Sequence, residues 1–280
     1  MWLVAFAAAF LAASIAVAVL LTAPNQTAMP SPPVELAARS VSFPSKSGAL
    51  IHGWLAPGRR GGGAVLLLHG VHASRLAMLE RAQFLHAAGY SVLLLDFQAH
   101  GESAGNHITF GYLESQDAEA AVEFLRAQIP GERLGIVATS MGGAAVLLSS
   151  PPLDADALIL EQVYPAIAQA LDNRLRLYLG LAGSLVAPVL RWEMQRLLGI
   201  TAQQLRPIDH IGDVKQPLLM IAGDADQHTL LSDSQQLFDA ARAPKQLWIV
   251  EGARHVDLCV YAGAEYRQHV LEFLQRELRK

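Results

Sequence analysis

From residue 39 to the C-terminus, short runs of apolar residues alternate with longer stretches in which apolar and polar positions recur at helical spacing. A continuous apolar run is typical of a strand buried on both faces, and apolar residues three or four positions apart are typical of an amphipathic helix. Their alternation predicts a mostly parallel sheet with helices packed on both faces. The predicted strands are 64–68, 91–96, 134–138, 157–160, 217–222 and 246–250, and the predicted helices are 76–88, 113–128, 141–148, 232–241 and 261–278.

Two segments depart from this alternation. Residues 41–44 and 50–55 flank the turn residue Gly48, and they predict a hairpin that leads into the sheet. Residues 163–210 have a helical pattern, over 166–190 and 191–198, and contain no strand candidate. We interpret 163–210 as a small helical lid inserted between two strands; the alternative is a set of extra helices packed on the edge of the sheet.

The N-terminal segment is apolar, and residues 1–21 contain no charged side chain. About 20 apolar residues in a helix span roughly 30 Å, the thickness of the hydrocarbon core of a bilayer. We therefore predict a transmembrane anchor over residues 1–22. A cleaved signal segment is the main alternative, although no basic residue precedes Arg39; a buried core helix is the other. Residues 23–38 are rich in proline and predict a linker, which leaves residues 39–280 as the folded domain, expected outside the cytoplasm.

Composition and charge exclude several classes of protein. Apolar residues make up 52% of the 280 residues and charged residues only 16%, which is typical of a chain with a large core and excludes a disordered one. The net charge is −4 and no Lys/Arg-rich tract is present, so a nucleic-acid partner is not expected. Cys259 is the single cysteine, so a disulfide within the chain is excluded.

The strongest chemical signal is Ser140, which lies between a predicted strand and a predicted helix. Residues 138–142 (Ala-Thr-Ser-Met-Gly) approximate the pattern G-x-S-x-G, in which a serine occupies a sharp strand-to-helix turn. The residues two positions from such a serine have to be small, and alanine at 138 meets that requirement. The alternative is a serine that caps the helix and is followed by small residues that allow close packing.

Acidic residues and a histidine follow two later strands. Asp224 and Asp226 come after the strand at 217–222, and His255 comes after the strand at 246–250. In open α/β sheets, ligands and chemistry lie at the carboxyl ends of the strands. A serine hydroxyl becomes a good nucleophile when an imidazole removes its proton, and a carboxylate orients that imidazole.

Together these segments resemble the α/β-hydrolase superfamily. His69-Gly70-Val71 is similar to the start of the superfamily's oxyanion loop, and residues 96–103 are similar to its D-x-R-G-H-G-x-S stretch, with departures at Gln98 and Ala99. The resemblance covers residue 39 to the C-terminus, interrupted by the lid. It implies an α/β-hydrolase fold with a mostly parallel eight-stranded sheet, helices on both faces and a small helical lid.

The resemblance also implies roles for individual residues. In this fold the nucleophile comes first in the chain, the acid second and the histidine last. The superfamily pattern places the acid at the second aspartate after its strand, and some relatives carry it one strand earlier; His100 as the base is a rival that this chain order disfavours. The implied catalytic residues are Ser140, Asp226 and His255, the alternative acids are Asp224 and Glu161, and the backbone N–H groups of Val71 and Met141 are the implied oxyanion donors.

Residues 101–105 and 109–114 further resemble Bem46-type bacterial hydrolases, which carry one N-terminal membrane segment. The expected activity is hydrolysis of a small carboxylic ester, and the few charges of the lid suggest an apolar acyl group. A peptidase, thioesterase or acyltransferase would use the same three residues. A non-catalytic, membrane-tethered scaffold is the alternative of a different kind. The expected partners are the small-molecule acyl substrate and a membrane, and no cofactor or metal ion is expected.

Overall fold

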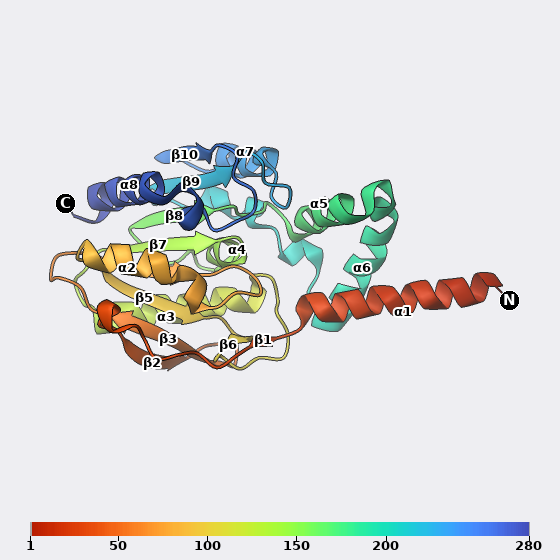
Figure 1. Cartoon of the computed structure of the whole chain (residues 1–280), viewed down its shortest axis with the longest axis horizontal. Helices are drawn as coiled ribbons and strands as arrows, with labels where there is room; N and C mark the ends of the chain where they lie inside the picture. The colour runs from red at the N-terminus through yellow and green to blue at the C-terminus, as the bar shows by residue number, and fades with distance from the viewer. Residues whose placement is uncertain (1, 280) are drawn as a thin grey trace.

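An eight-stranded sheet forms the centre of the computed structural model, which describes residues 2–279 (Figure 1). Its strand order is β10-β9-β8-β7-β4-β5-β3-β2. β3 runs antiparallel to both of its neighbours and all other pairs are parallel, so the predicted sheet and its leading hairpin are confirmed. The strands are β2 (Arg39–Pro44), β3 (Leu50–Ala56), β4 (Ala64–Leu68), β5 (Ser91–Asp96), β7 (Leu134–Thr139), β8 (Ala157–Glu161), β9 (Leu218–Gly223) and β10 (Lys245–Val250).

Helices cover both faces of the sheet, as predicted. Because successive residues of a strand point to opposite faces, the two central strands β4 and β5 are buried at every position. Leu66 and Leu93 contribute to an apolar cluster with α3, α4 and α7 on one face, and Val65 and Val92 contribute to a cluster with α2 and α8 on the other. These helices are α2 (Leu79–Ala87), α3 (Tyr112–Gln128), α4 (Met141–Leu148), α7 (Leu231–Ala240) and α8 (Leu258–Leu278).

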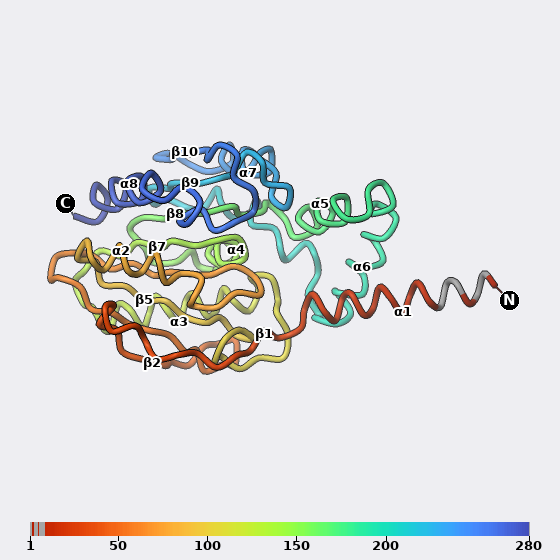
Figure 2. Tube along the Cα trace, in the orientation of Figure 1, coloured from red at the N-terminus to blue at the C-terminus, as the bar shows by residue number. Residues whose placement is uncertain are grey.

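Two helices, α5 (Ile167–Leu179) and α6 (Gly183–Leu198), make up most of residues 163–210 and extend beyond the carboxyl ends of the strands (Figure 2). They separate at the 3₁₀ turn Gly180–Ala182, earlier in the chain than the pattern predicts. A Cβ atom on Gly183 would lie 2.6 Å from the backbone of Leu175. Glycine therefore allows the two helices to approach each other closely. We refer to α5 and α6 as the lid.

The N-terminal helix α1 (Trp2–Thr22) packs against α6 of the lid. The Ser14 hydroxyl donates a hydrogen bond of 2.6 Å to the Glu193 carboxylate, and Ala18 is buried in the contact. α1 lies inside the range predicted as a transmembrane anchor; Met1 and the side chains of residues 3, 4 and 6–8 lie outside the described residues. Over the part of the chain that is described, no helix combines the length and the apolar character that crossing a membrane requires.

The segment predicted as a linker, residues 23–38, makes several contacts with the domain. β1 (Asn25–Gln26) pairs in parallel with β6 (His100–Gly101), which lies in the loop that follows β5. Farther along, the 3₁₀ turn Val34–Leu36 places the Leu36 side chain in the core beside α2. These contacts fix the end of α1 relative to the loops at the carboxyl edge of the sheet.

Candidate active site

Ser140 occupies the turn between the end of β7 and the first residue of α4. Its φ and ψ angles are 51° and −113°, a sparsely populated combination for a residue with a side chain, which costs about 1–3 kcal/mol. The Ser140 N–H donates to the Glu161 carbonyl oxygen at 2.8 Å, and the Ser140 carbonyl oxygen accepts from the Ala144 N–H at 3.0 Å. The strained turn that the sequence predicts is therefore present and is held by two backbone hydrogen bonds.

Small residues surround this turn because the end of β4 passes close to it. A Cβ atom on Gly142 would lie 2.7 Å from the Leu68 carbonyl oxygen, a distance that real Cβ contacts do not tolerate. A Cβ atom on Gly70 would lie 3.5 Å from the Ser140 Cβ, an ordinary contact. Of these two glycines, Gly142 is the one that the packing requires.

The Asp226 carboxylate and the His255 imidazole form a hydrogen bond, with 2.7 Å between Oδ2 and Nδ1. Asp226 lies in the loop after β9, and His255 lies in the loop between β10 and α8. These strands are parallel neighbours, so their carboxyl ends bring the two loops together. Asp226 is 3% exposed, whereas the His255 side chain retains 19% exposure and reaches the surface of a cavity.

Three further hydrogen bonds orient the Asp226 carboxylate toward His255. Oδ1 accepts from the N–H groups of His228 at 2.8 Å and Thr229 at 2.9 Å. Oδ2 accepts from the Gln162 amide at 3.1 Å in addition to the imidazole. Hydrogen bonds to an ionised acceptor are stronger than neutral ones, so this set fixes both oxygens and presents Oδ2 to Nδ1.

Ser140 and His255 line one cavity of about 310 Å³ at the carboxyl ends of the strands. Ser140 also lines a smaller, largely apolar cavity of about 100 Å³. The lid and the last turn of α1 contribute to its walls through Ile167, Leu171, Met194 and Leu21. A nucleophile at this position would border both the larger cavity and the small apolar one.

The backbone N–H groups of Val71 and Met141 are free of protein acceptors among the described residues. Val71 follows the His69-Gly70 pair and lines both cavities, while Met141 is the first residue of α4 and lines the smaller cavity. The first N–H groups of a helix have no partner within it. The two predicted oxyanion donors therefore border the same space as Ser140.

The two alternative acids make contacts that differ from those of Asp226. Asp224 Oδ1 accepts from the Gly252 N–H at 2.7 Å, a bond that ties together the loops after β9 and β10. Glu161 forms a buried ion pair with Arg81 at 2.7 Å and also accepts hydrogen bonds from Thr139 and Tyr266. Neither carboxylate contacts His255, which is bonded to Asp226.

The other two buried histidines of this region use both ring nitrogens for structural contacts. His69 Nε2 accepts from the Phe97 N–H and its Nδ1 lies 2.7 Å from the Gly70 carbonyl oxygen; burial lowers its pKa to about 3. His100 Nδ1 lies 2.9 Å from the Gln98 carbonyl oxygen and its Nε2 accepts from the His72 N–H, and burial lowers its pKa as well. His100 thus lacks a free nitrogen for the role of base.

Two residues at the site are not indicated by any of the sequence motifs described above. Gln162 follows β8 with a φ of 51° and bridges the Asp226 carboxylate to the Arg254 carbonyl oxygen. Arg174 projects from α5 and lines both cavities that Ser140 lines. The position of Gln162 at the carboxyl end of a strand could have identified it, whereas a lid residue such as Arg174 has no comparable rule.

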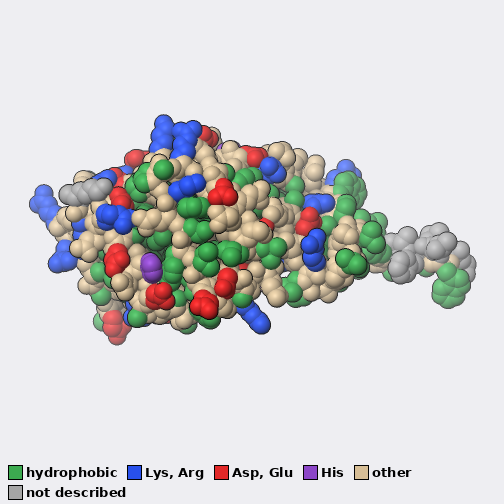
Figure 3. All heavy atoms as spheres, turned by 90° about the horizontal axis from the view of Figure 1, so that it is seen from above, with side chains coloured by type: hydrophobic (Ala, Val, Ile, Leu, Met, Phe, Trp, Pro, Cys, Tyr) green, Lys and Arg blue, Asp and Glu red, His purple; other side chains and the backbone are tan. Residues whose placement is uncertain are grey.

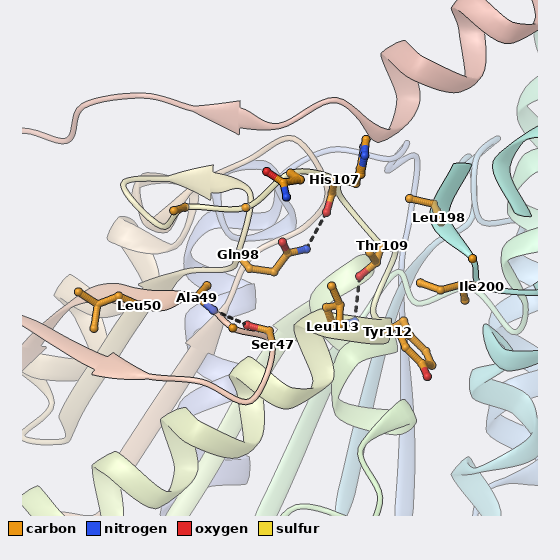
Figure 4. A pocket seen from close by; sticks show the side chains of 15 residues that line it. Ser47, Ala49, Leu50, Gln98, His107, Thr109, Tyr112, Leu113, Leu198 and Ile200 are labelled. Atoms are coloured by element: carbon orange, nitrogen blue, oxygen red, sulfur yellow. Dashed lines mark hydrogen bonds between the residues drawn. The ribbon is translucent and has the colours of Figure 1, made fainter. Parts of the chain in front are cut away.

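A cavity of about 620 Å³, larger than the two beside Ser140, lies elsewhere and is lined by none of the three predicted catalytic residues (Figure 4). It lies beside the β2–β3 turn, the loop before α3 and the end of α6. The Gln98 amide donates hydrogen bonds to the His107 carbonyl oxygen and to Glu114, both at 2.8 Å. The amide N–H groups of Gln98 are therefore already bonded to other residues of the protein. Across the described residues, no group of three or more His, Cys, Asp and Glu side chains is arranged to hold a metal ion.

Comparison with known proteins agrees with this architecture. A family model described as serine aminopeptidase, S33, matches residues 60–198. Protein Rv2307c of Mycobacterium tuberculosis is 30% identical over 245 residues, which cover 85% of this chain and 79% of the relative. The α/β hydrolase domain-containing protein WAV2 of Arabidopsis thaliana is 27% identical over 252 residues, covering 83% and 77%.

Solved structures give the same fold. The esterase Pf2001 of Pyrococcus furiosus superposes with a TM-score of 0.76 at 23% identity, covering 92% of this chain and 98% of the esterase. At that identity the likeness concerns the fold. Taken with the sequence relatives, it shows that the chain belongs to the α/β-hydrolase superfamily.

Proposed function

We propose that this protein hydrolyses carboxylic esters through an acyl-enzyme on Ser140, with His255 as the base and Asp226 as the orienting acid. The observation that carries the proposal is the 2.7 Å Asp226–His255 hydrogen bond, formed beside a strained serine that lines the same cavity as the imidazole. A serine with only a structural role would not require a strained backbone conformation. An Asp–His pair with only a structural role would not require an adjacent open cavity.

The geometry supports a sequence of proton transfers. With Nδ1–H donating to Asp226, Nε2 of His255 is the nitrogen available to take the proton from the Ser140 hydroxyl. Oγ then attacks the ester carbonyl carbon, and the bond to the alcohol oxygen breaks as His255 returns the proton to that oxygen. Water attacks the acyl-enzyme by the same route and releases the acid and free Ser140.

The negative charge that develops on the carbonyl oxygen requires donors at a fixed position. In the proposal, the N–H groups of Val71 and Met141 supply them, because both border the space in front of Ser140 and neither donates to a protein acceptor among the described residues. One such donor contributes about 3 kcal/mol to stabilisation of the transition state. Backbone donors of this kind are already oriented before the substrate binds.

An ester with a short acyl chain is the substrate class that the cavities favour. The smaller cavity beside Ser140 is largely apolar and has a volume of about 100 Å³. A peptidase, thioesterase or acyltransferase would share Ser140, Asp226 and His255, so the substrate panel includes a p-nitroanilide and a thioester of the same acyl group.

The test is covalent labelling followed by turnover. A fluorophosphonate probe is expected to label the wild type and the matched control Ser149→Ala, at the other end of α4, and not Ser140→Ala. Among p-nitrophenyl esters we expect turnover to be highest for acetate to hexanoate. Folded wild-type protein that takes up no probe and hydrolyses no ester would leave the non-catalytic scaffold as the better explanation.

We also propose that α1 and the lid contact a lipid bilayer. Large apolar side chains are exposed on both, at the end of the molecule where hydrophobic side chains gather (Figure 3), and exposed apolar surface of this kind marks interaction sites. They include Phe10, Leu11, Ile15, Val19 and Leu20 on α1, Leu181 in the turn between the two lid helices, and Leu185 and Trp192 on α6. Membership of the Bem46-type subgroup stays a prediction.

Flotation with phosphatidylcholine vesicles tests the contact. We expect the wild type and the control Val34→Ser, which changes an exposed apolar residue outside α1 and the lid, to float equally. The double variant Leu181→Ser, Leu185→Ser is expected to float less. Equal flotation of all three proteins, or none at all, would refute a lipid contact through the lid.

A further inference from the structure

Arg174 is a positively charged residue placed over the predicted nucleophile. It lies on α5 of the lid and lines both the cavity shared by Ser140 and His255 and the smaller apolar cavity that Ser140 also lines. Its position is central to the site, because a substrate in either cavity would contact it.

The guanidinium of Arg174 has no carboxylate partner among the described residues. Its hydrogen bond is a long one, 3.5 Å from Nη1 to the Ala170 carbonyl oxygen of its own helix. Other arginines near the site are paired: Arg191 of the lid binds Asp172 at 3.0 Å, and Arg81, which also lines the larger cavity, binds Glu161 and Asp257. Among the described arginines that line these cavities, Arg174 is thus the one whose guanidinium N–H groups are not paired with a carboxylate.

Arg174 is partly buried, and this changes its electrostatics. Burial lowers the pKa of Arg174 below the usual value for arginine, because the charged form is partly removed from water. Burial, followed by the nearby charges of Arg174 and His255, also lowers the pKa of His228, whose ring lies 5.2 Å from the His255 ring. The nearby Asp226 carboxylate is already engaged by His255 and three N–H donors. A bound anion would satisfy the guanidinium and offset this local positive charge.

We propose that Arg174 forms an anion subsite and that the substrate is an ester that carries a carboxylate a few atoms from the scissile carbonyl. A planar guanidinium binds a carboxylate through two parallel hydrogen bonds. A single carboxylate matches the single unpaired cation, since no lysine lines either cavity. This inference rests on the proposed ester hydrolysis and adds the charge of the substrate to it.

Two pairs of substrates test the subsite, one for each side of the ester. The acyl pair is the mono-p-nitrophenyl ester of adipic acid and p-nitrophenyl hexanoate, which have the same number of acyl carbons. The alcohol pair is the acetate ester of 4-hydroxybenzoate and that of 4-hydroxybenzamide. In each pair the anionic and neutral members have nearly the same shape, so their ratio of kcat/KM isolates the charge.

We expect Arg174→Gln to lower kcat/KM for the anionic member of at least one pair by about 10- to 100-fold, the loss of a charge-assisted contact. The neutral member should change by less than about threefold, which also reports that the variant is folded. Arg174→Lys should recover part of the anionic activity, because it keeps the charge and loses the two parallel bonds. Arg176→Gln, an exposed arginine two residues along the same helix, is the matched control and should leave both ratios unchanged.

The outcomes separate this inference from the function on which it rests. If neutral esters are hydrolysed and Arg174→Gln changes both members of both pairs alike, the anion subsite is wrong and ester hydrolysis stands. If the wild type hydrolyses no ester and takes up no fluorophosphonate, the proposed function fails and the inference fails with it.

Discussion

Asp226→Asn changes one oxygen of the predicted acid to an amide nitrogen, and the surroundings of Asp226 allow no orientation of that amide without a conflict. If the nitrogen takes the place of Oδ1, it faces the N–H groups of His228 and Thr229. If it takes the place of Oδ2, it faces the Gln162 amide and Nδ1 of His255. In either orientation at least one N–H donor meets another donor.

The second orientation damages the proposed chemistry most. An amide N–H beside Nδ1 favours the tautomer that carries its proton on Nε2, which then cannot accept the proton of Ser140. The same substitution in a Ser-His-Asp triad lowers kcat by about 10⁴-fold, and we expect a loss of that order here. Each charge-assisted hydrogen bond that is lost would also cost about 1.5–3 kcal/mol of stability, so a lower Tm should accompany the loss of activity.

The assay is kcat/KM for p-nitrophenyl butyrate, with the Tm of each protein measured beside it. Asp224→Asn is the matched control, because it makes the same chemical change two residues away, at a carboxylate that is bonded to the Gly252 N–H, and the remaining amide oxygen can keep that bond. It should retain activity within about tenfold. Equal losses in the two variants, or less than a tenfold loss for Asp226→Asn in a folded protein, would refute the assignment of Asp226 as the acid.

Three further predictions concern the framework of the site. Gly142→Ala places a Cβ atom 2.7 Å from the Leu68 carbonyl oxygen and should lower the free energy of unfolding by about 1–3 kcal/mol in urea titrations; a wild-type midpoint would contradict the packing described. Glu161→Gln leaves the buried Arg81 with only part of its compensating charge and should cost about 3 kcal/mol, with urea midpoints as the measure and an unchanged midpoint as the contrary result. His69 has a folded pKa of about 3, below the usual imidazole value of about 6.5. As the pH falls below about 6.5, the unfolded chain therefore binds a proton at His69 that the folded chain does not bind, and the free energy of unfolding decreases. The fall in Tm between pH 7 and 4.5 should be smaller in His69→Gln than in the wild type.

Much of the sheet could be predicted because its strands are encoded locally. β4 and β5 are buried on both faces, and the uninterrupted apolar runs 64–68 and 92–95 suit that position. The turn at Ser140 was also visible, since its close approach to the backbone of β4 demands a glycine at 142. These features depend on a few neighbouring residues, and a single sequence carries that information.

The remainder depends on residues that are distant in the chain. Asp226 and Asp224 both follow β9, and the residues alone do not distinguish them; in the structure Asp226 contacts His255 and Asp224 contacts Gly252. The hydrogen bond between Ser14 and Glu193 joins α1 to the lid, and no pattern among neighbouring residues in the sequence predicts it. The apolar character of residues 1–22 predicts that this segment is removed from water. It does not distinguish a lipid bilayer from a neighbouring helix as the partner of the segment.

The site residues that the sequence predicts and those that it does not predict come from different parts of the fold. Ser140, Asp226 and His255 come from loops at strand ends, where the sheet fixes their positions. Arg174 and the apolar wall of the smaller cavity come from the lid and the last turn of α1, whose arrangement depends on helix packing. Under the proposed function, the reaction type would depend on residues that the sheet positions, and the choice of substrate on residues of helices that pack outside the sheet.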